Sequence, residues 1–337
     1  MKAKVRWSLV LVLFGLVWSV SAVQDKSAGQ PSEPLALVQV ESQPAAEGWP
    51  PTEAAKGKIA FQSDRDGNDE IYVMNADGTD PVNLTNNPAG DGGPAWSPDG
   101  SKIAFSSDRE GDEEIYVMDS DGKNVKRLTF NPADDGMPAW SPDGSKIAFN
   151  GMRNGNWEIL VMNADGTGEV NITDRPSSDK SPCWSPDGSK IAFHSRKQGE
   201  EEVYLNDDIF VMNADGSNRV NITNNPADDA HPAWSPGGAK IAFASERSGS
   251  WQVYTMDADG SDVANLSNNA PVLNTFPRWS PDGKMIAFDS TRDGNWDVYI
   301  MFADGKYSYR ITNDLALDWA PSWILPSEQP PTVEPAV

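Results

Sequence analysis

One tripeptide recurs through most of the chain at a nearly constant spacing. Ile-Ala-Phe occurs six times, and successive copies begin 44, 44, 44, 50 and 45 residues apart. The copies begin at Ile59, Ile103, Ile147, Ile191, Ile241 and Ile286. A repeat of this length is one supersecondary unit, which cannot bury its own apolar faces and needs neighbouring copies to cover them. We therefore expect an array of six similar units.

Each unit contains four short segments typical of β-strands. The second unit reads Pro-Ala-Trp (94–96), Ile-Ala-Phe (103–105), Ile-Tyr-Val-Met (115–118) and Leu-Thr (128–129), with glycine-containing turns between them. The middle segments are apolar on both sides of the pleat, so both faces of the sheet must be covered. The Asp-Gly pairs between segments are hairpin signals. No part of the repeat region has sustained helical periodicity.

Six sheets that each need a neighbour on both flanks are satisfied by a closed ring. Blades of about 40–50 residues are typical of β-propellers. The first unit lacks its own inner strand, whereas the segment Asp-Trp-Ala-Pro-Ser-Trp (318–323) matches an inner strand and has no second strand after it. We predict an all-β, six-bladed propeller with four antiparallel strands per blade, closed by the C-terminal strand, with Trp323 beside Ile59. The alternative assignment takes Trp49 as the first inner strand.

The segments on either side of the repeats differ from it in composition. Residues 1–22 have the pattern of a signal peptide, because Lys2, Lys4 and Arg6 precede an uncharged run that ends near Val-Ser-Ala (20–22). The alternative is an uncleaved N-terminal anchor. Residues 23–56 contain five prolines and are predicted to be a disordered linker, the propeller takes residues 57–325, and residues 326–337 form a disordered tail. We expect an extracytoplasmic protein, periplasmic or secreted.

Composition limits the classes of partner and site. Lys plus Arg number 27 against 50 Asp plus Glu, a net charge of −23. Such a charge disfavours nucleic acid and the surface of an anionic membrane. Cys183 is the single cysteine and His194 and His231 are the only histidines, which excludes multi-cysteine and multi-histidine metal sites. We expect a monomer without a cofactor, whose mature domain does not insert into a membrane.

The repeat resembles that of a known family. Trp-Ser-Pro-Asp-Gly (96–100), followed by Ile-Ala-Phe, Ile-Tyr-Val-Met and Asp-Gly, is similar to the WD40-like (PD40) repeat of TolB-type propellers. Six copies agree in register and cover nearly all of residues 57–325. The resemblance covers the propeller half of that family, and residues 23–56 stand where the family carries an α/β domain. It implies an exported envelope protein without catalytic activity that binds partner peptides at the mouth of the central channel.

A ring of carboxylates is the first candidate site. Five residues before each inner-strand Trp, the sequence has Asp91, Asp135, Asp179, Asp229, Asn274 and Asp318. If inner strands line the channel, these residues lie where it opens, and five converging carboxylates would attract a basic peptide segment or a cation such as calcium. The alternative is pairing with the basic residues of the turns after the second strands. These residues are Arg65, Arg109, Arg153, Lys197, Arg247 and Arg292.

Aromatic residues and one insertion are further candidates. Trp157, Trp251 and Trp296 follow the same turns, and Phe276 and Trp319 are assigned to connections between blades. If exposed, they would suit a peptide or a sugar ring. The alternative is packing between blades. Residues 200–207 lengthen the corresponding turn of the fourth unit, and insertions in repeat proteins often lie at the binding face.

We therefore expect a non-enzymatic propeller that binds a protein or peptide at its channel face. Two alternatives remain. One is an envelope propeller that binds carbohydrate or acts as a lyase, since these repeats also resemble those of oligogalacturonate lyases. The other is an accessory propeller that acts with a peptidase on a separate chain, as in prolyl-oligopeptidase-like enzymes.

Overall fold

The computed structural model describes residues 10–13, 16–19, 55–198 and 204–325. The chain divides into two compact units, Met1–Pro44 and Ala45–Val337. In the first unit, β1 (Val10–Leu13) pairs antiparallel with β2 (Leu16–Ser19). This hairpin falls in the segment predicted to be a signal peptide. The remainder of residues 1–22, the predicted linker up to residue 54 and the tail 326–337 lie outside the described residues, so these three assignments stay predictions. Within the described ranges, no helix is both long and apolar enough to span a membrane.

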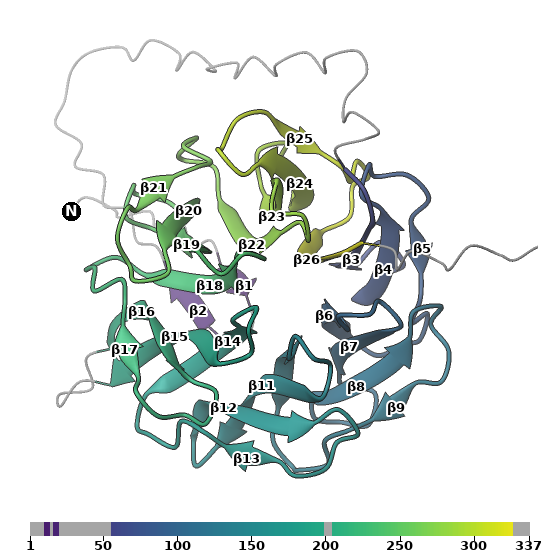
Figure 1. Ribbon diagram of the computed structural model, residues 1–337. Coiled ribbons are helices and arrows are strands. Elements are labelled where there is room, and N and C mark those ends of the chain that lie inside the picture. The colour runs from purple at the N-terminus through teal and green to yellow at the C-terminus, as the bar shows by residue number, and fades with distance from the viewer. Residues whose placement is uncertain (1–9, 14–15, 20–54, 199–203, 326–337) are drawn as a thin grey trace, which may run out of the picture. The chain divides into compact units, whose positions relative to one another are not determined.

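The second unit consists of six four-stranded antiparallel sheets arranged in a ring (Figure 1). Blade 1 is β26-β3-β4-β5, and blades 2 to 6 are β6–β9, β10–β13, β14–β17, β18–β21 and β22–β25. Around the channel stand the inner strands β26 (Asp318–Ile324), β6 (Asp91–Trp96), β10 (Asp135–Trp140), β14 (Ser178–Trp184), β18 (Asp229–Trp234) and β22 (Asn274–Trp279). The second strands are β3 (Lys58–Ser63), β7 (Lys102–Ser107), β11 (Lys146–Arg153), β15 (Lys190–Gln198), β19 (Lys240–Ser245) and β23 (Met285–Ser290).

The remaining strands complete each blade on its outer side. The third strands are β4 (Glu70–Asn75), β8 (Glu114–Asp119), β12 (Asn156–Asn163), β16 (Tyr204–Asn213), β20 (Gln252–Asp257) and β24 (Asp297–Phe302). The outer strands are β5 (Val82–Asn83), β9 (Lys126–Arg127), β13 (Val170–Asn171), β17 (Val220–Asn221), β21 (Ala264–Asn265) and β25 (Ser308–Arg310). The predicted closure is confirmed, because β26 pairs with β3 and Trp323 lies opposite Ile59.

The hydrophobic core lies between the blades. One cluster combines Ala104 and Ile115 of blade 2 with Ile147, Phe149 and Leu160 of blade 3. The phenylalanine of Ile-Ala-Phe is fully buried in all six blades. Each blade therefore buries both of its apolar faces against two neighbours, which is the reason why the sheets close into a ring.

The inner-strand tryptophans also link the blades. The indole Nε1 of Trp140 donates to the carbonyl oxygen of Ala95 in the preceding blade at 3.2 Å. Trp184 makes the same bond to Ala139. Trp279 makes it to Ala233, whereas the indole Nε1 atoms of Trp96 and Trp234 are buried without a hydrogen-bond partner among the described residues. The large ring of each tryptophan packs beside the inner strands. This repeated use accounts for six of the thirteen tryptophans.

The Asp-Gly turn between third and outer strands is also an inter-blade contact. Gly122 has φ +82°, and a Cβ added there would lie 2.7 Å from the carbonyl oxygen of Leu84 in blade 1. Glycine is required for two reasons, since it adopts the left-handed backbone and lets the turn lie against the neighbouring blade.

Candidate binding site at the channel

The inner strands share an irregularity that shapes the channel. Each has a β-bulge in its pairing with the second strand of the same blade. In every blade the residue before the inner-strand proline has a φ between 47° and 57°. These residues, which we call the bulge ring, are Gly93, Met137, Ser181, His231, Phe276 and Ala320. Five of the six are not glycine, so each is held in a conformation that costs roughly 1 kcal/mol or more. A bulge redirects side chains, and this one forms part of the channel wall.

The predicted carboxylate ring lies at the start of the inner strands, and all six side chains are fully buried. Each contacts an arginine. The pairs are Arg65–Asp318 (2.8 Å), Arg109–Asp91 (2.8 Å), Arg153–Asp135 (2.7 Å), Arg219–Asp179 (3.1 Å), Arg247–Asp229 (2.9 Å) and Arg292–Asn274 (3.2 Å). Burial raises the pKa of Asp135, Asp179, Asp229 and Asp318, against the opposing effect of the guanidinium groups.

This geometry favours the pairing interpretation of the acidic ring. In blade 2, Asp91 and Arg109 belong to the same sheet, so the pair ties the turn after the second strand to the inner strand of its own blade rather than to the next blade. The guanidinium also lies over Phe105 and Tyr116 of that blade, 5.3 and 4.6 Å from the ring centroids. Binding of a cation or peptide by these carboxylates stays a prediction.

Blade 4 departs from the predicted pairing. The sequence pattern assigns Lys197 to Asp179, but the carboxylate contacts Arg219, which immediately precedes the outer strand β17. The side chain of Lys197 lies outside the described residues. Residues 200–203 of the predicted insertion 200–207 also lie outside them, whereas its second half, Tyr204–Asp207, forms the start of β16. The insertion therefore lengthens the hairpin of β15 and β16.

The three predicted tryptophans stand at one repeat position, immediately before the buried run of the third strand. In the other three blades this position holds a carboxylate. We call the set the mouth ring: Asp69, Glu113, Trp157, Asp207, Trp251 and Trp296. All six are partly exposed. The backbone carbonyls of Asp69 and Trp296 accept hydrogen bonds from the first residue of the next inner strand, which fixes this position at a blade junction beside the channel.

The carboxyl groups of the mouth ring lie close to other charged side chains. Burial raises the pKa of Asp69 and of Glu113, and neighbouring carboxylates such as Asp108 raise both further. Asp207 is paired with Arg196 at 2.5 Å. On the tryptophan side, the ammonium of Lys180 lies 5.0 Å from the ring centroid of Trp157.

Two predicted aromatic residues lie elsewhere than expected. The sequence pattern places Phe276 and Trp319 in connections between blades, but both lie inside the inner strands β22 and β26. Phe276 belongs to the bulge ring and stacks on His231, with ring centroids 3.7 Å apart. Trp319 is the second residue of its strand and is partly exposed. The inner strands begin earlier than the Pro-Ala-Trp pattern indicates, which explains the error.

The channel wall brings together residues that sequence reasoning left apart. Ser181 Oγ lies 3.2 Å from His231 Nδ1, and the His194 and His231 rings meet edge-on with centroids 5.4 Å apart. Burial lowers the pKa of His194 to about 3 and holds that of His231 well below its ordinary value. The sequence offered one signal for this cluster: each histidine stands at a repeat position where the other units have a different residue.

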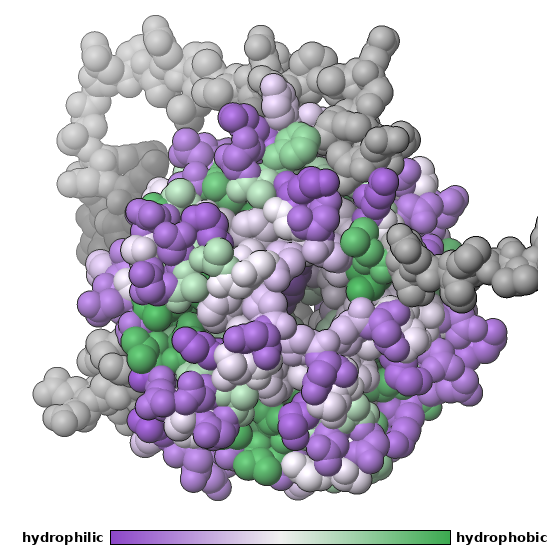
Figure 2. All heavy atoms as spheres, in the orientation of Figure 1, coloured by the Kyte–Doolittle hydropathy of each residue, from purple (hydrophilic) through white to green (hydrophobic). Residues whose placement is uncertain are grey.

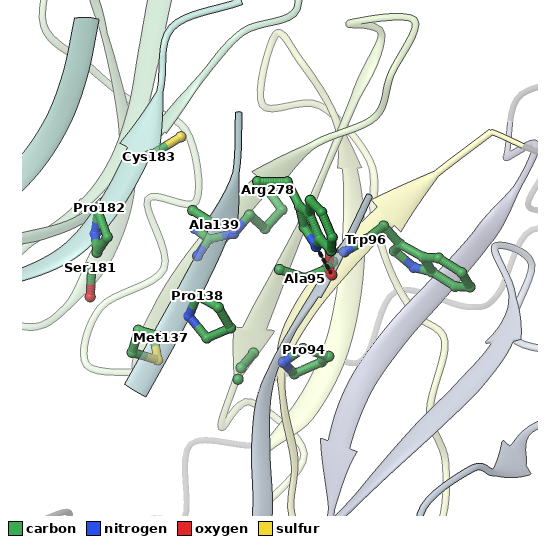
Figure 3. Close-up of a pocket in the computed structure, with 14 residues that line it drawn as sticks. Pro94, Ala95, Trp96, Met137, Pro138, Ala139, Ser181, Pro182, Cys183 and Arg278 are labelled. Carbon is green, nitrogen blue, oxygen red and sulfur yellow. Dashed lines mark hydrogen bonds between the residues drawn. The ribbon is translucent and has the colours of Figure 1, made fainter. Parts of the chain in front are cut away.

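The ring is hollowed at its centre, and within the channel is a cavity of about 160 Å³ (Figures 2 and 3). Its wall comes from the inner strands of blades 1 to 4 and from Arg278 of blade 6. Met137, Pro138 and Ala139 form one side of it. Among the described residues, no group of three or more His, Cys, Asp or Glu side chains is arranged to hold a metal ion.

The repeat match identifies the family. The model of the TolB β-propeller domain (PD40) matches residues 36–135, 132–207 and 205–270. The chain belongs to the TolB β-propeller family. A search of the curated proteins gave no match.

Solved structures agree with this TolB-type fold. TolB from Acinetobacter baumannii is 24% identical with a TM-score of 0.66, and the match covers 79% of this chain and 66% of that one. A TolB from Agrobacterium tumefaciens, described as putative in its own title, is 21% identical with a TM-score of 0.61, covering 80% and 98%. Hydrazine synthase from Kuenenia stuttgartiensis is 18% identical with a TM-score of 0.69, covering 81% and 48%. These identities show the fold alone, and this TolB-type propeller spans about two thirds of the A. baumannii protein.

Proposed function

We propose that this chain is a non-enzymatic binding propeller that takes a protein or peptide segment at the mouth of its channel. The observation that carries the proposal is the mouth ring, in which three partly exposed tryptophans and three carboxylates stand at equivalent positions around one opening. Membership of the TolB β-propeller family supports the same class of function.

The chemistry of the mouth ring favours a segment with both apolar and basic side chains. Trp157, Trp251 and Trp296 offer large, rigid apolar surfaces, the kind of residue that dominates binding energy at protein interfaces. The raised pKa values of Asp69 and Glu113 reflect burial and repulsion from neighbouring carboxylates such as Asp108, and an incoming Lys or Arg would relieve this repulsion. The net charge of −23 would speed the approach of a basic partner.

We propose an extracytoplasmic location on the basis of the N-terminal pattern of Lys2, Lys4 and Arg6 followed by an uncharged run. Expression of the full chain, with mass spectrometry of the mature N-terminus, tests this part. A new N-terminus near Ala22 in the exported fraction supports it, and an intact Met1 in the cytoplasm contradicts it.

A peptide-display screen tests binding at the mouth. The full chain is immobilised, random twelve-residue peptides are selected, and the affinities of enriched peptides are measured by fluorescence anisotropy. Two variants probe the mouth ring, W157A/W251A/W296A and D69N/E113Q. Tyr307→Ala is the matched control, because this exposed aromatic lies at the turn between third and outer strands, on the opposite side of the blades.

We expect enriched peptides to combine aromatic or aliphatic residues with Lys or Arg. The tryptophan variant should lose at least about tenfold in affinity, the charge variant should lose its dependence on salt, and Tyr307→Ala should bind as wild type. Equal binding by the wild type and the tryptophan variant would remove the proposal, provided that both melt at similar temperatures.

A further inference from the structure

A second ring of residues lies deeper in the channel, at the position before each inner-strand tryptophan. Its members, which we call the cavity ring, are Ala95, Ala139, Cys183, Ala233, Arg278 and Ser322. Five are small and one is an arginine. Five of the six line the 160 Å³ cavity, Arg278 among them (Figure 3). Because the other side chains of the cavity ring are small, they leave an open space, and the arginine side chain faces it.

The guanidinium of Arg278 has few protein partners. Among the described residues it makes one hydrogen bond, from Nη1 to the carbonyl oxygen of Pro277 at 2.9 Å, and no ion pair. This contrasts with the arginines that pair with the acidic ring, each of which meets a side chain at the start of an inner strand. A guanidinium carries five N–H donors, so most of those of Arg278 remain available to a ligand in the cavity.

Asp289 is the carboxyl group whose charge acts on Arg278 within the fold, but it does not bind the guanidinium. One of its oxygens accepts a hydrogen bond from the backbone N–H of Ala320 at 3.2 Å, and the other has no partner. Burial raises the pKa of Asp289 well above its ordinary value, which favours the neutral carboxyl. The cation in the cavity is therefore poorly compensated.

The cavity limits the ligand in three ways. A volume of about 160 Å³ is close to that of an engineered cavity of roughly 150 Å³ that holds benzene. The single guanidinium of Arg278 balances one negative charge on a ligand. The strongly acidic chain repels a dianion more than a monoanion. Most of the other lining residues have apolar side chains, among them Pro94, Met137, Trp96 and Ala139, and polar atoms supply nearly half of the lining surface. A planar guanidinium matches a carboxylate with two parallel hydrogen bonds.

We propose that the channel cavity binds a monocarboxylate with a small apolar body, with Arg278 as its counter-ion. The carboxylate has two sources with the same chemistry: a free small acid, or the C-terminal carboxylate of a peptide that ends in an apolar residue. The site is distinct from the mouth ring and does not depend on the function proposed there.

Isothermal titration calorimetry of the full chain tests the cavity with four probes. They are benzoate, inorganic phosphate, and one apolar-ended hexapeptide with either a free C-terminus or a C-terminal amide. Arg278→Gln removes the positive charge. Ala139→Leu fills the cavity but leaves the Arg278 guanidinium in place. Arg175→Gln is the matched control, because it removes one positive charge from an exposed side chain away from the cavity. Thermal melts establish that each variant is folded.

We expect at least one carboxylate probe to bind the wild type and the Arg175→Gln variant equally, and to bind Arg278→Gln and Ala139→Leu at least about tenfold more weakly. Tighter binding of benzoate than of the free-ended peptide assigns a free acid. Tighter binding of the free-ended peptide than of both benzoate and its own amide assigns a peptide terminus. The proposal fails if neither carboxylate binds, if folded Arg278→Gln binds as wild type, or if phosphate binds as tightly as the tighter of the two carboxylate probes. Failure here leaves the display screen of the mouth ring unaffected.

Discussion

Two adjacent positions on the second strands behave in opposite ways. The phenylalanine of Ile-Ala-Phe is identical and fully buried in six blades. The next residue differs in every blade, as Gln62, Ser106, Asn150, His194, Ala244 and Asp289. Side chains of successive strand residues point to opposite faces, so the phenylalanine packs in the core between blades and the next residue faces the inner strands. In four blades this next residue contacts a bulge-ring N–H of the following blade, whereas the Ser106 hydroxyl donates to the Gly92 carbonyl oxygen of its own blade. Across the six blades of this chain, the position that packs in the core is therefore constant, and the position that faces the channel wall varies.

The variable position has a structural task of its own. Asn150 Oδ1 accepts a hydrogen bond from the backbone N–H of Ser181 in the next blade at 3.3 Å, and Asp289 does the same for Ala320 at 3.2 Å. Each acceptor thus satisfies an N–H of the bulge ring. Because glutamine, asparagine and aspartate can all do this, the position tolerates variety that the phenylalanine position does not.

Truncating one residue of each kind in blade 3 gives the largest contrast. Phe149→Ala should lower the free energy of unfolding by about 3–5 kcal/mol, because it opens a cavity in a fully packed core. Asn150→Ala should cost about 1 kcal/mol, since it leaves one N–H unsatisfied and Ala244 already occupies this position in blade 5. Urea unfolding followed by tryptophan fluorescence measures both. Equal losses would contradict the division into a fixed and a variable position.

The buried histidine pair should make the stability of the fold depend on pH. Both histidines are neutral in the folded protein, because burial lowers the pKa of His194 to about 3 and that of His231 well below its ordinary value. The charges of Lys180, Arg196 and Arg278 lower these pKa values further. Unfolded histidines take up protons below about pH 6.5, so stability should fall as the pH drops through 6.5 towards the folded pKa values.

The variant H194N/H231S isolates this effect, since it copies Asn150 and Ser181 from the preceding junction. Relative to the variant, the wild type should lose about 2–4 kcal/mol between pH 7 and pH 5. Urea titrations at intervals of half a pH unit measure the difference, in which carboxyl groups common to both proteins largely cancel. Parallel curves for the two proteins would mean that the buried rings do not govern acid stability.

Two turn glycines show how much a constant position contributes when it also contacts a neighbouring blade. Gly122→Ala should cost about 2–3 kcal/mol, because its Cβ would meet the Leu84 carbonyl oxygen of blade 1 in addition to the strained φ. Gly155 has a similar φ, +91° against +82°, but nothing within 4 Å of an added Cβ, so Gly155→Ala should cost only about 1 kcal/mol. Differential scanning calorimetry compares the two. A smaller loss at Gly122 would exclude the inter-blade contact as the reason for glycine.

The smallest effect is expected where one blade already carries the substitution. Asp229→Asn should cost about 1 kcal/mol or less, because Asn274 meets Arg292 in the same place in blade 6. Asp229→Ala should cost about 3 kcal/mol, since it leaves the Arg247 guanidinium without its carboxylate. Melting temperatures of the two variants test the order, and a larger loss for asparagine than for alanine would reverse our interpretation of the ring.

Much of the fold could be predicted from the sequence because the evidence was repeated six times. The spacing of Ile-Ala-Phe and the unpaired final inner strand were enough to place Trp323 beside Ile59. The starts of the inner strands were harder to predict, since a bulge interrupts each of them, as between Thr275 and Arg278, and breaks the alternating pattern of a regular strand. For this reason the sequence pattern places Phe276 and Trp319 in connections rather than in strands.

The candidate site was only partly predictable, because its members meet through space. Trp157, Trp251 and Trp296 were recognisable as rare residues at one register. Asp69 and Glu113 occupy the same register but are two among 50 acidic residues, and nothing in the sequence distinguishes them. The pairing of Arg219 with Asp179 could not be predicted either, since the arginine comes from a different hairpin than in the other blades.

The pairing of β26 with β3 has a consequence for biosynthesis. Arg65 and its partner Asp318 are 253 residues apart in sequence, whereas the pairs within blades 2, 3, 5 and 6 join residues only 18 apart. During translation, those four blades can form their own sheets as they leave the ribosome, but β3 must wait with an unpaired edge until β26 has been made. The first blade to be synthesised is thus the last to be completed, and an exposed strand edge accompanies the nascent chain throughout.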